Sequence, residues 1–150
     1  MDGLPRVLVV EDDGGIRRLL AMALRREALH VDTAGDGAEA LRLCAATEYA
    51  VIILDLMMPV MNGFEFLDAF GRANPSARSV IFVASAFDDR LMSNLTSPLV
   101  HGIIRKPFDV EQLVIMVRDV ATAWTGTAQP EASAPAAIRG EQLRPPDSVC

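Results

Sequence analysis

Lysine is nearly absent from this chain of 150 residues: one lysine, Lys106, stands among 14 basic residues, and the others are arginine. Positive charge is scarce as well, because 20 acidic residues give a formal net charge of −6. Proteins that bind the nucleic acid backbone carry the opposite excess, so we expect no direct DNA binding. The lone lysine is notable because an ammonium is a compact point charge, whereas a guanidinium is a planar fork.

Cysteine and long apolar runs are also scarce. The two cysteines, Cys44 and Cys150, are too few for a disulfide scaffold, and no Cys-x-x-Cys pair or histidine cluster indicates zinc. No apolar run approaches the roughly 18 residues of a membrane span. The first residues lack the basic start and long apolar stretch of a signal peptide. We therefore expect a cytoplasmic protein that does not contact a membrane.

The sequence does contain a regular alternation of short apolar runs and amphipathic patterns. The apolar runs predict strands at 6–10, 29–34, 51–54, 79–84 and 100–105. The patterns between and after them predict helices at 16–24, 37–46, about 63–72 and about 110–123. This order predicts an α/β fold with a doubly wound, five-stranded parallel sheet and flanking helices.

Two segments do not follow this alternation. Residues 88–100 predict only a short or irregular helix, because Asn94 and Pro98 are poor helix residues. Residues 125–150 are rich in alanine and proline and poor in large apolar side chains. We predict one folded domain at 1–124, followed by a disordered tail at 125–150 without an effector domain.

Polar side chains stand where four of the predicted strands end. Glu11 and Asp12 follow the first strand, Asp55 the third, Ser85 the fourth and Lys106 the fifth. The carboxyl ends of the strands are where such sheets place their chemistry. Clustered carboxylates repel one another unless a cation neutralises them, and Mg²⁺ prefers oxygen ligands.

The residue types indicate phosphoryl transfer, because an aspartate can attack phosphorus and form an acyl phosphate. Glu11 and Asp12 would hold Mg²⁺, and Asp55 would act as the nucleophile. Ser85 and Lys106 would contact the phosphoryl oxygens, a task that suits a point charge.

Five stretches match a known pattern across about residues 5–123: VLVVEDDGGIRRLL, AGDGAEAL, VIILDLMMPVMNGFEFL, VIFVASA and IRKPF. Together they resemble the response-regulator receiver domain of two-component signalling, which implies a flavodoxin-like (CheY-like) fold. The resemblance implies that Asp55 accepts a phosphoryl group, with Mg²⁺, from a histidine kinase or histidine phosphotransfer protein. It also implies that Asp55 and the backbone carbonyl of Met57 join the acidic pair as metal ligands. The bond between Lys106 and Pro107 is normally cis in the family.

The sequence departs from the family at the position that usually carries an aromatic switch residue, three residues before the lysine. Ile103 stands there, so no large ring follows Ser85 inward on phosphorylation. Met57 and Phe87 flank the phosphorylation site in the family, and both are apolar here. We hypothesise that they hinder attack by water and give a long-lived phosphoryl group on Asp55.

We predict a stand-alone response regulator in a phosphorelay that signals through protein–protein contacts, with dimerisation on phosphorylation left open. It would be no enzyme beyond assisting its own Mg²⁺-dependent phosphorylation and dephosphorylation. The alternative is a receiver-like module that binds proteins independently of phosphorylation, which Ile103 favours and the complete set of site residues opposes. A hydrolase with Asp55 as nucleophile would need a second acid/base carboxylate and a capping insertion, and the sequence shows neither.

A formal dinucleotide-binding fingerprint also needs explanation. Gly35, Gly37 and Ala40 match Gly-x-Gly-x-x-Ala between a predicted strand and a predicted helix. Asp36 and Glu39 would repel a pyrophosphate at that turn. We therefore interpret the glycines as a tight turn into a helix.

Overall fold

A single parallel sheet forms the centre of the computed structural model, which describes residues 3–86 and 97–126. Its strands lie in the order β2-β1-β3-β4-β5. They are β1 (Arg6–Val10), β2 (His30–Ala34), β3 (Val51–Asp55), β4 (Val80–Ala86) and β5 (Val100–Lys106). The strand order reverses beside β1, so the sheet is doubly wound, as the sequence predicts.

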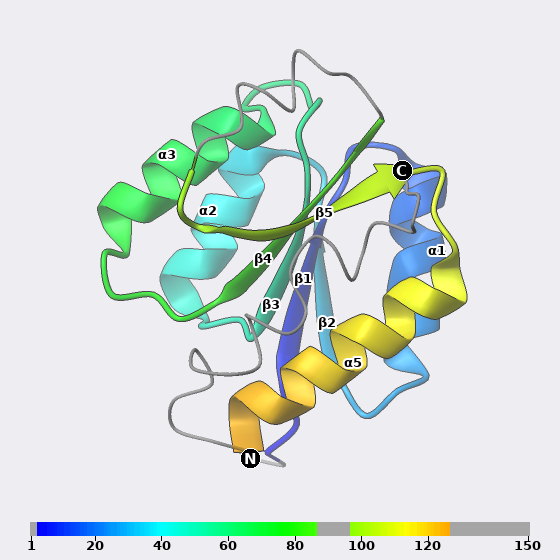
Figure 1. Cartoon of the computed structure of the whole chain (residues 1–150). Helices are drawn as coiled ribbons and strands as arrows, with labels where there is room; N and C mark the ends of the chain where they lie inside the picture. The colour runs from blue at the N-terminus through cyan, green and yellow to red at the C-terminus, as the bar shows by residue number, and fades with distance from the viewer. Residues whose placement is uncertain (1–2, 87–96, 127–150) are drawn as a thin grey trace.

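Helices cover both faces of the sheet (Figure 1). One face carries α1 (Gly14–Arg25) and α5 (Val110–Gly126), and the other carries α2 (Gly37–Ala46) and α3 (Gly63–Ala73). All five strands and four helices that the sequence predicts are confirmed, with boundaries that differ by at most three residues. No helix among the described residues is both long and apolar enough to cross a membrane.

Two further predictions cannot be compared in full. The irregular helix at 88–100 falls mostly outside the described residues, which resume at 97, and the tail at 125–150 falls almost entirely outside them.

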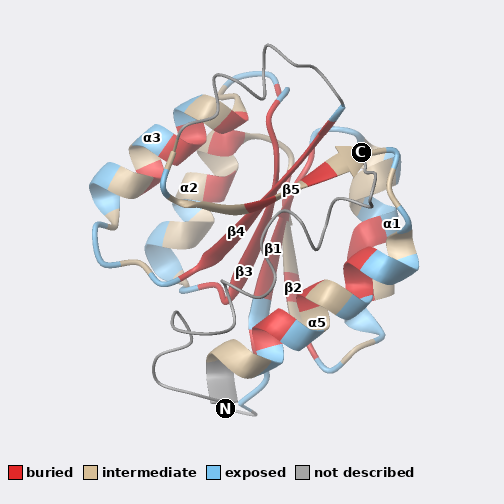
Figure 2. Ribbon diagram, in the orientation of Figure 1, coloured by how far each residue is buried: buried red, intermediate tan, exposed pale blue. Residues whose placement is uncertain are grey.

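Two apolar layers hold the sheet between its helices. Val7 and Val9 of β1 pack toward one layer, whereas Leu8 and Val10 pack toward the other, because side chains alternate across a strand. Every residue of β3 is buried, as expected for a central strand covered on both faces. Figure 2 shows the buried strands at the centre and the exposed positions on the outer helix faces. This rigid centre fixes the side chains that follow the strands.

Polar caps fix the loops at the carboxyl edge. The Asp13 carboxylate accepts a hydrogen bond from the Ile16 amide at 2.9 Å at the start of α1. A reciprocal capping box joins Asn62 and Glu65 at the start of α3, with both hydrogen bonds at 2.9 Å. Asp109 accepts from the Gln112 amide at 3.1 Å at the start of α5. Each cap satisfies amides that a helix leaves unpaired at its first turn.

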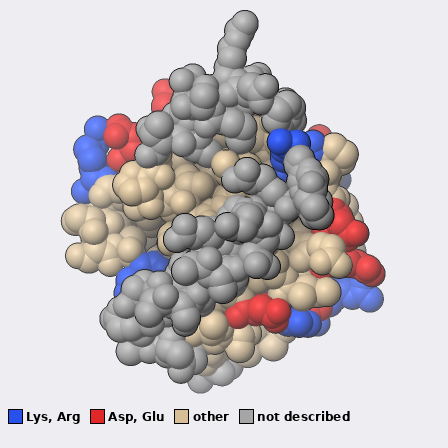
Figure 3. All heavy atoms as spheres, viewed as in Figure 1, with Lys and Arg blue, Asp and Glu red and all other residues tan. Residues whose placement is uncertain are grey.

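Charged groups lie mainly at the periphery of the molecule. In Figure 3, acidic and basic side chains of the described residues lie next to one another on the face shown. This intermixing is typical of a solvated surface. The carboxylates described next differ because two of them are buried.

Candidate functional site

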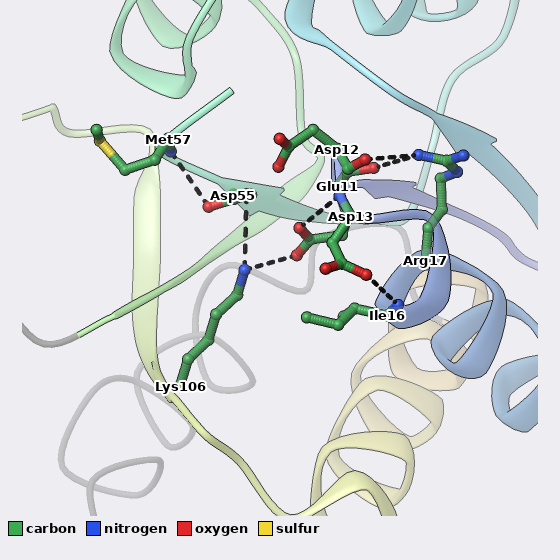
Figure 4. Close-up of polar contacts among 8 residues, drawn as sticks. All are labelled: Glu11, Asp12, Asp13, Ile16, Arg17, Asp55, Met57 and Lys106. Carbon is green, nitrogen blue, oxygen red and sulfur yellow. Dashed lines mark hydrogen bonds and ion pairs between the residues drawn. The ribbon is translucent and has the colours of Figure 1, made fainter. Parts of the chain in front are cut away.

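Three carboxylates converge at the carboxyl edge of the sheet. Asp55 ends β3, and Glu11 and Asp12 follow β1, its neighbour in the sheet. One carboxylate oxygen from each lies within 4.8 Å of the other two. Glu11 and Asp55 are 3% and 4% exposed, whereas Asp12 is exposed. The structure thus brings together the acidic residues that the sequence singles out (Figure 4).

The single lysine of the chain reaches this cluster from the end of β5. Lys106 Nζ lies 2.7 Å from Glu11 Oε1 and 3.6 Å from Asp55 Oδ2. Burial lowers the pKa of Lys106, but the hydrogen bond with Glu11 and the charges of both carboxylates outweigh it and hold the pKa above its usual value. The ammonium therefore stays charged and neutralises part of the cluster.

The carboxyl group of Asp55 has a raised pKa. Burial first, and then the negative charge of Glu11, raise its pKa to about 7. The Met57 amide, 3.2 Å from Asp55 Oδ1, and the Lys106 charge oppose this shift only in part. One ammonium does not balance the three carboxylates, so the cluster favours a further cation. A set of carboxylate oxygens is the donor chemistry that Mg²⁺ prefers, and the residues fit this ion.

Ser85 ends the buried part of β4, the strand between those that end in Asp55 and Lys106. Ser85 is 1% exposed, and its Oγ has no hydrogen-bond partner among the described residues. It pairs in the sheet with Arg105, the residue before Lys106, and follows Ala84, which pairs with Asp55. A buried hydroxyl without a partner is costly, and the predicted role of Ser85 at the site stays a prediction.

Two further residues hold the turn between β1 and α1: Asp13 within the turn and Arg17 in the first part of α1. Besides capping α1, Asp13 donates its amide to Glu11 Oε2 at 3.2 Å. Arg17 Nη1 donates to the carbonyl oxygens of Glu11 and Asp12, at 2.8 and 3.4 Å. The position of Asp13 directly before an amphipathic stripe could have indicated a cap. Arg17 gives no such signal, because it is one of two adjacent arginines.

Several finer expectations have different outcomes. The bond between Lys106 and Pro107 is cis, as the resemblance implies. Ile103 is half-buried on β5 and pairs with Val83. The Met57 amide contacts Asp55, while a metal-binding role for its carbonyl stays a prediction. Phe87 lies outside the described residues.

The glycine-rich segment before α2 is a turn into a helix, as predicted, and it packs closely against the loop after β3. Gly37 donates its amide to the Met61 carbonyl at 3.0 Å, and a Cβ there would lie 2.8 Å from that oxygen. Glu39 accepts from the Gly35 amide, and Asp36 caps the helix by accepting from the Glu39 amide, each at 2.9 Å. The carboxylates of Asp36 and Glu39 thus accept hydrogen bonds from amides of this turn, where a dinucleotide-binding protein would bind a pyrophosphate.

The surroundings of Gly63 show how tightly the end of β3 is packed. A Cβ on Gly63 would lie 2.7 Å from both the Asp55 carbonyl oxygen and Leu56 Cα. We expect Gly63→Ala to lower the free energy of unfolding by about 1–3 kcal/mol in urea titrations, because the β3–α3 turn must shift. Gly14→Ala is the control, since Gly14 also begins a helix and a Cβ there meets only ordinary contacts at 3.6 Å. Equal stability of the two variants would contradict the tight packing.

Comparison with known proteins gives one consistent result. Residues 7–118 match the model of the response regulator receiver domain. The chain is 34% identical over 119 residues to the probable transcriptional regulatory protein TcrX of Mycobacterium tuberculosis, covering 78% of this chain and 50% of TcrX. It is 37% identical over 115 residues to the transcriptional regulatory protein PrrA of Mycobacterium leprae, covering 76% and 48%. The chain therefore spans about half the length of these curated relatives.

Solved structures share the fold. The chemotaxis response regulator CheY4 of Vibrio cholerae has a TM-score of 0.69 and 30% identity, with 78% of this chain and 98% of CheY4 covered. The response regulator TrrA of Thermotoga maritima, in complex with Mg²⁺ and BeF, has a TM-score of 0.67 and 31% identity, with 78% and 99% covered. The match over most of the chain and the shared sheet topology show that the chain belongs to the response regulator receiver domains of two-component systems.

Proposed function

We propose that this protein accepts a phosphoryl group on Asp55 from a histidine kinase or a histidine phosphotransfer protein, with Mg²⁺, and signals through protein–protein contacts. Receiver domains are phosphoacceptors that bind Mg²⁺ in an acidic pocket. The observation that carries the assignment to Asp55 is its place in this chain: a buried carboxylate at the end of β3, 3.6 Å from the only lysine and beside Glu11 and Asp12.

The residues of the site divide the transfer between them. An Asp55 carboxylate oxygen forms a bond to phosphorus while the bond between phosphorus and the donor nitrogen breaks, and the electron pair stays on the donor imidazole. Lys106 and Ser85 would hold phosphoryl oxygens, a role that the 3.6 Å distance between Lys106 and Asp55 supports for the lysine. Glu11, Asp12, Asp55 and the Met57 carbonyl would hold Mg²⁺, which, when bound, supplies positive charge to neutralise the phosphoryl oxygens.

The output of the phosphorylated state is a finer proposal. We propose that phosphorylation changes the contacts of this domain with other proteins, and the residues after 126 lie outside the described structure. The relatives named as transcriptional regulatory proteins are about twice as long as the matched region, so their output is not carried over to this chain. The absence of direct DNA binding rests on the net charge of −6 and stays a prediction.

A second candidate, binding of proteins independently of phosphorylation, rests on Ile103. A half-buried aliphatic side chain on β5 offers no aromatic ring to report a movement of Ser85. This candidate predicts that partners bind equally well to the phosphorylated and unphosphorylated protein.

Phosphorylation by a small phosphodonor separates the two candidates. The protein is incubated with acetyl phosphate and Mg²⁺, and its intact mass is recorded. We expect one phosphoryl adduct, lost in Asp55→Asn and in the presence of a chelator. No adduct at any Mg²⁺ concentration would favour the module that acts independently of phosphorylation.

The lifetime of the phosphoryl group depends on Met57 in this proposal. Met57 is 59% exposed, and its amide contacts Asp55, so its apolar side chain stands at the edge of the site. We expect Met57→Asn to lose phosphate several-fold faster, because an amide side chain can orient an attacking water. Leu19→Asn, which exposes an amide on the outer face of α1, is the control. Equal decay of Met57→Asn and wild type, followed by intact mass, would contradict the hypothesis.

A further inference from the structure

Arg17 uses its guanidinium in an unusual way for a charged residue beside an acidic site. Its Nη1 donates to two backbone carbonyls, those of Glu11 at 2.8 Å and Asp12 at 3.4 Å. Among the described residues, it forms an ion pair with none of the carboxylates. Figure 4 shows the guanidinium on the side of the turn away from Asp55. Arg17 therefore contacts the backbone of Glu11 and Asp12 and not their carboxylates.

The guanidinium also lies against the neighbouring turn after β2. A Cβ on Gly35 would lie 3.5 Å from Arg17 Nη1, an ordinary van der Waals distance, so the guanidinium packs beside Gly35. The same two turns are joined by a hydrogen bond from the Glu11 amide to the Ala34 carbonyl at 3.0 Å. Arg17, which bonds to the turn after β1 and packs beside Gly35, thus lies where a backbone hydrogen bond joins the ends of β1 and β2.

The backbone held in this way directs both carboxylates. The carboxylate of Glu11 is fixed at one oxygen by Lys106 and at the other by the Asp13 amide. Asp12 has no comparable support: it is exposed, and no hydrogen bond to its carboxylate is found among the described residues. Its direction therefore depends on the backbone of the turn, which Arg17 holds by the carbonyls on either side of the Asp12 amide.

We propose that Arg17 is a positioning residue for the metal site, which fixes the Glu11–Asp12 backbone so that the Asp12 carboxylate is ready to bind Mg²⁺. The inference rests on the proposed function for its importance in signalling. It concerns metal binding, however, and does not require that Asp55 be phosphorylated. Groups that orient metal ligands are typically needed for full metal affinity.

The positive charge of Arg17 offers an alternative explanation, which predicts the opposite change in Mg²⁺ affinity when the arginine is removed. If the arginine acted only through its positive charge, its removal would tighten Mg²⁺ binding, because a cation near the site would be lost. If it acts by positioning, its removal weakens Mg²⁺ binding despite the loss of repulsion. Arg18, the next residue on α1, provides a matched control because it carries the same charge and bonds to neither carbonyl of the turn.

The test measures Mg²⁺ affinity by isothermal titration calorimetry for wild type, Arg17→Met, Arg17→Lys and Arg18→Met. We expect Arg17→Met to raise the dissociation constant about 10-fold or more. Arg17→Lys, which keeps the charge and one donor group, is expected to fall between wild type and Arg17→Met. Arg18→Met is expected to bind Mg²⁺ as well as wild type or slightly better. Mg²⁺ binding by Arg17→Met that equals or exceeds that of Arg18→Met would overturn the proposal.

Hydrogen exchange of the metal-free protein provides a second readout. We expect Arg17→Met to speed exchange of the Glu11 and Asp13 amides, while the Ile52 amide in the centre of β3 stays protected as in wild type. Unchanged exchange at both turn amides would overturn the positioning role even if Mg²⁺ binding fell. These outcomes are independent of phosphorylation. A protein whose Mg²⁺ affinity depends on Arg17 but that forms no adduct with acetyl phosphate contradicts only the proposed function.

Discussion

Asp55→Asn is expected to make the metal-free protein more stable at pH 8, although it removes the central residue of the site. The carboxyl group of Asp55 is 4% exposed and lies beside Glu11, and its pKa rises from 3.8 to about 7 on folding. The folded state therefore binds more protons than the unfolded state between these values. The free energy of unfolding then falls as the pH rises from about 4 to about 7, and the full penalty is present above that range.

The amide that replaces the carboxyl group in Asp55→Asn would carry no charge, and its oxygen could still accept from the Met57 amide. Lys106 would keep its hydrogen bond with Glu11. Since each unit of pKa shift corresponds to about 1.4 kcal/mol, we expect a gain of about 2–4 kcal/mol at pH 8. Urea unfolding in a buffer with a chelator measures it.

Two controls make this prediction specific. The advantage of Asp55→Asn should shrink as the pH falls from 8 to 5, because the wild-type carboxyl group becomes protonated in the folded state. Mg²⁺ should stabilise the wild type far more than the variant, since Asp55 is a proposed ligand of the metal in the folded state. A variant that is less stable than wild type at pH 8 without metal would show that the carboxylate is not under the repulsion described.

Lys106→Met is expected to have the largest destabilising effect at the site. It removes the only ammonium within reach of Glu11 and Asp55, which lie 2.7 and 3.6 Å away and are both buried. Breaking a buried ion pair by removing one partner leaves the other charge uncompensated, which costs about 3–5 kcal/mol. We expect a loss of this size at pH 8 in metal-free buffer, measured by urea unfolding.

A double variant identifies the cause of that loss. Adding Asp55→Asn to Lys106→Met removes one of the two uncompensated carboxylates, so the cost of the lysine substitution should fall. The surface pair of Arg72 and Asp68, 2.8 Å apart but 73% and 66% exposed, gives a comparison: Arg72→Met should cost about 0.3–0.5 kcal/mol. A Lys106→Met variant as stable as Arg72→Met would mean that the ammonium does not neutralise the cluster.

The sheet and the edge that holds the site could be predicted because they depend on simple sequence patterns: apolar runs and the polar residues that follow them. Continuous apolar runs such as Val51–Leu54 indicate strands covered on both faces, and parallel strands bring their carboxyl ends to one edge. Acidic, hydroxyl and lysine side chains at those ends then meet, as Asp55 and Lys106 do. The chemistry follows from residue types, while distances and protonation depend on burial, which local sequence does not reveal.

Other features of the site depend on contacts between distant parts of the chain or on local backbone geometry. Arg17 and Arg18 are indistinguishable in the sequence, yet only Arg17 is found bonded to the turn that carries Glu11 and Asp12. Val60 has a φ of 66° in the loop after Asp55, a conformation that a β-branched residue seldom adopts and that no sequence pattern indicates here. The lack of a partner for the Ser85 hydroxyl among the described residues likewise emerges only when the strands are placed side by side.

Chemical mapping of the phosphorylated residue tests most directly whether Asp55 is the phosphoacceptor. After incubation with acetyl phosphate and Mg²⁺, borohydride reduces an aspartyl phosphate to homoserine, and peptide mass mapping locates the converted residue. We predict homoserine at position 55 alone. Its formation should depend on Mg²⁺ and be absent when a chelator is present during the incubation with acetyl phosphate. Conversion at Asp12 or Asp13 in place of Asp55, or no conversion while a known receiver domain reacts in parallel, would contradict the assignment.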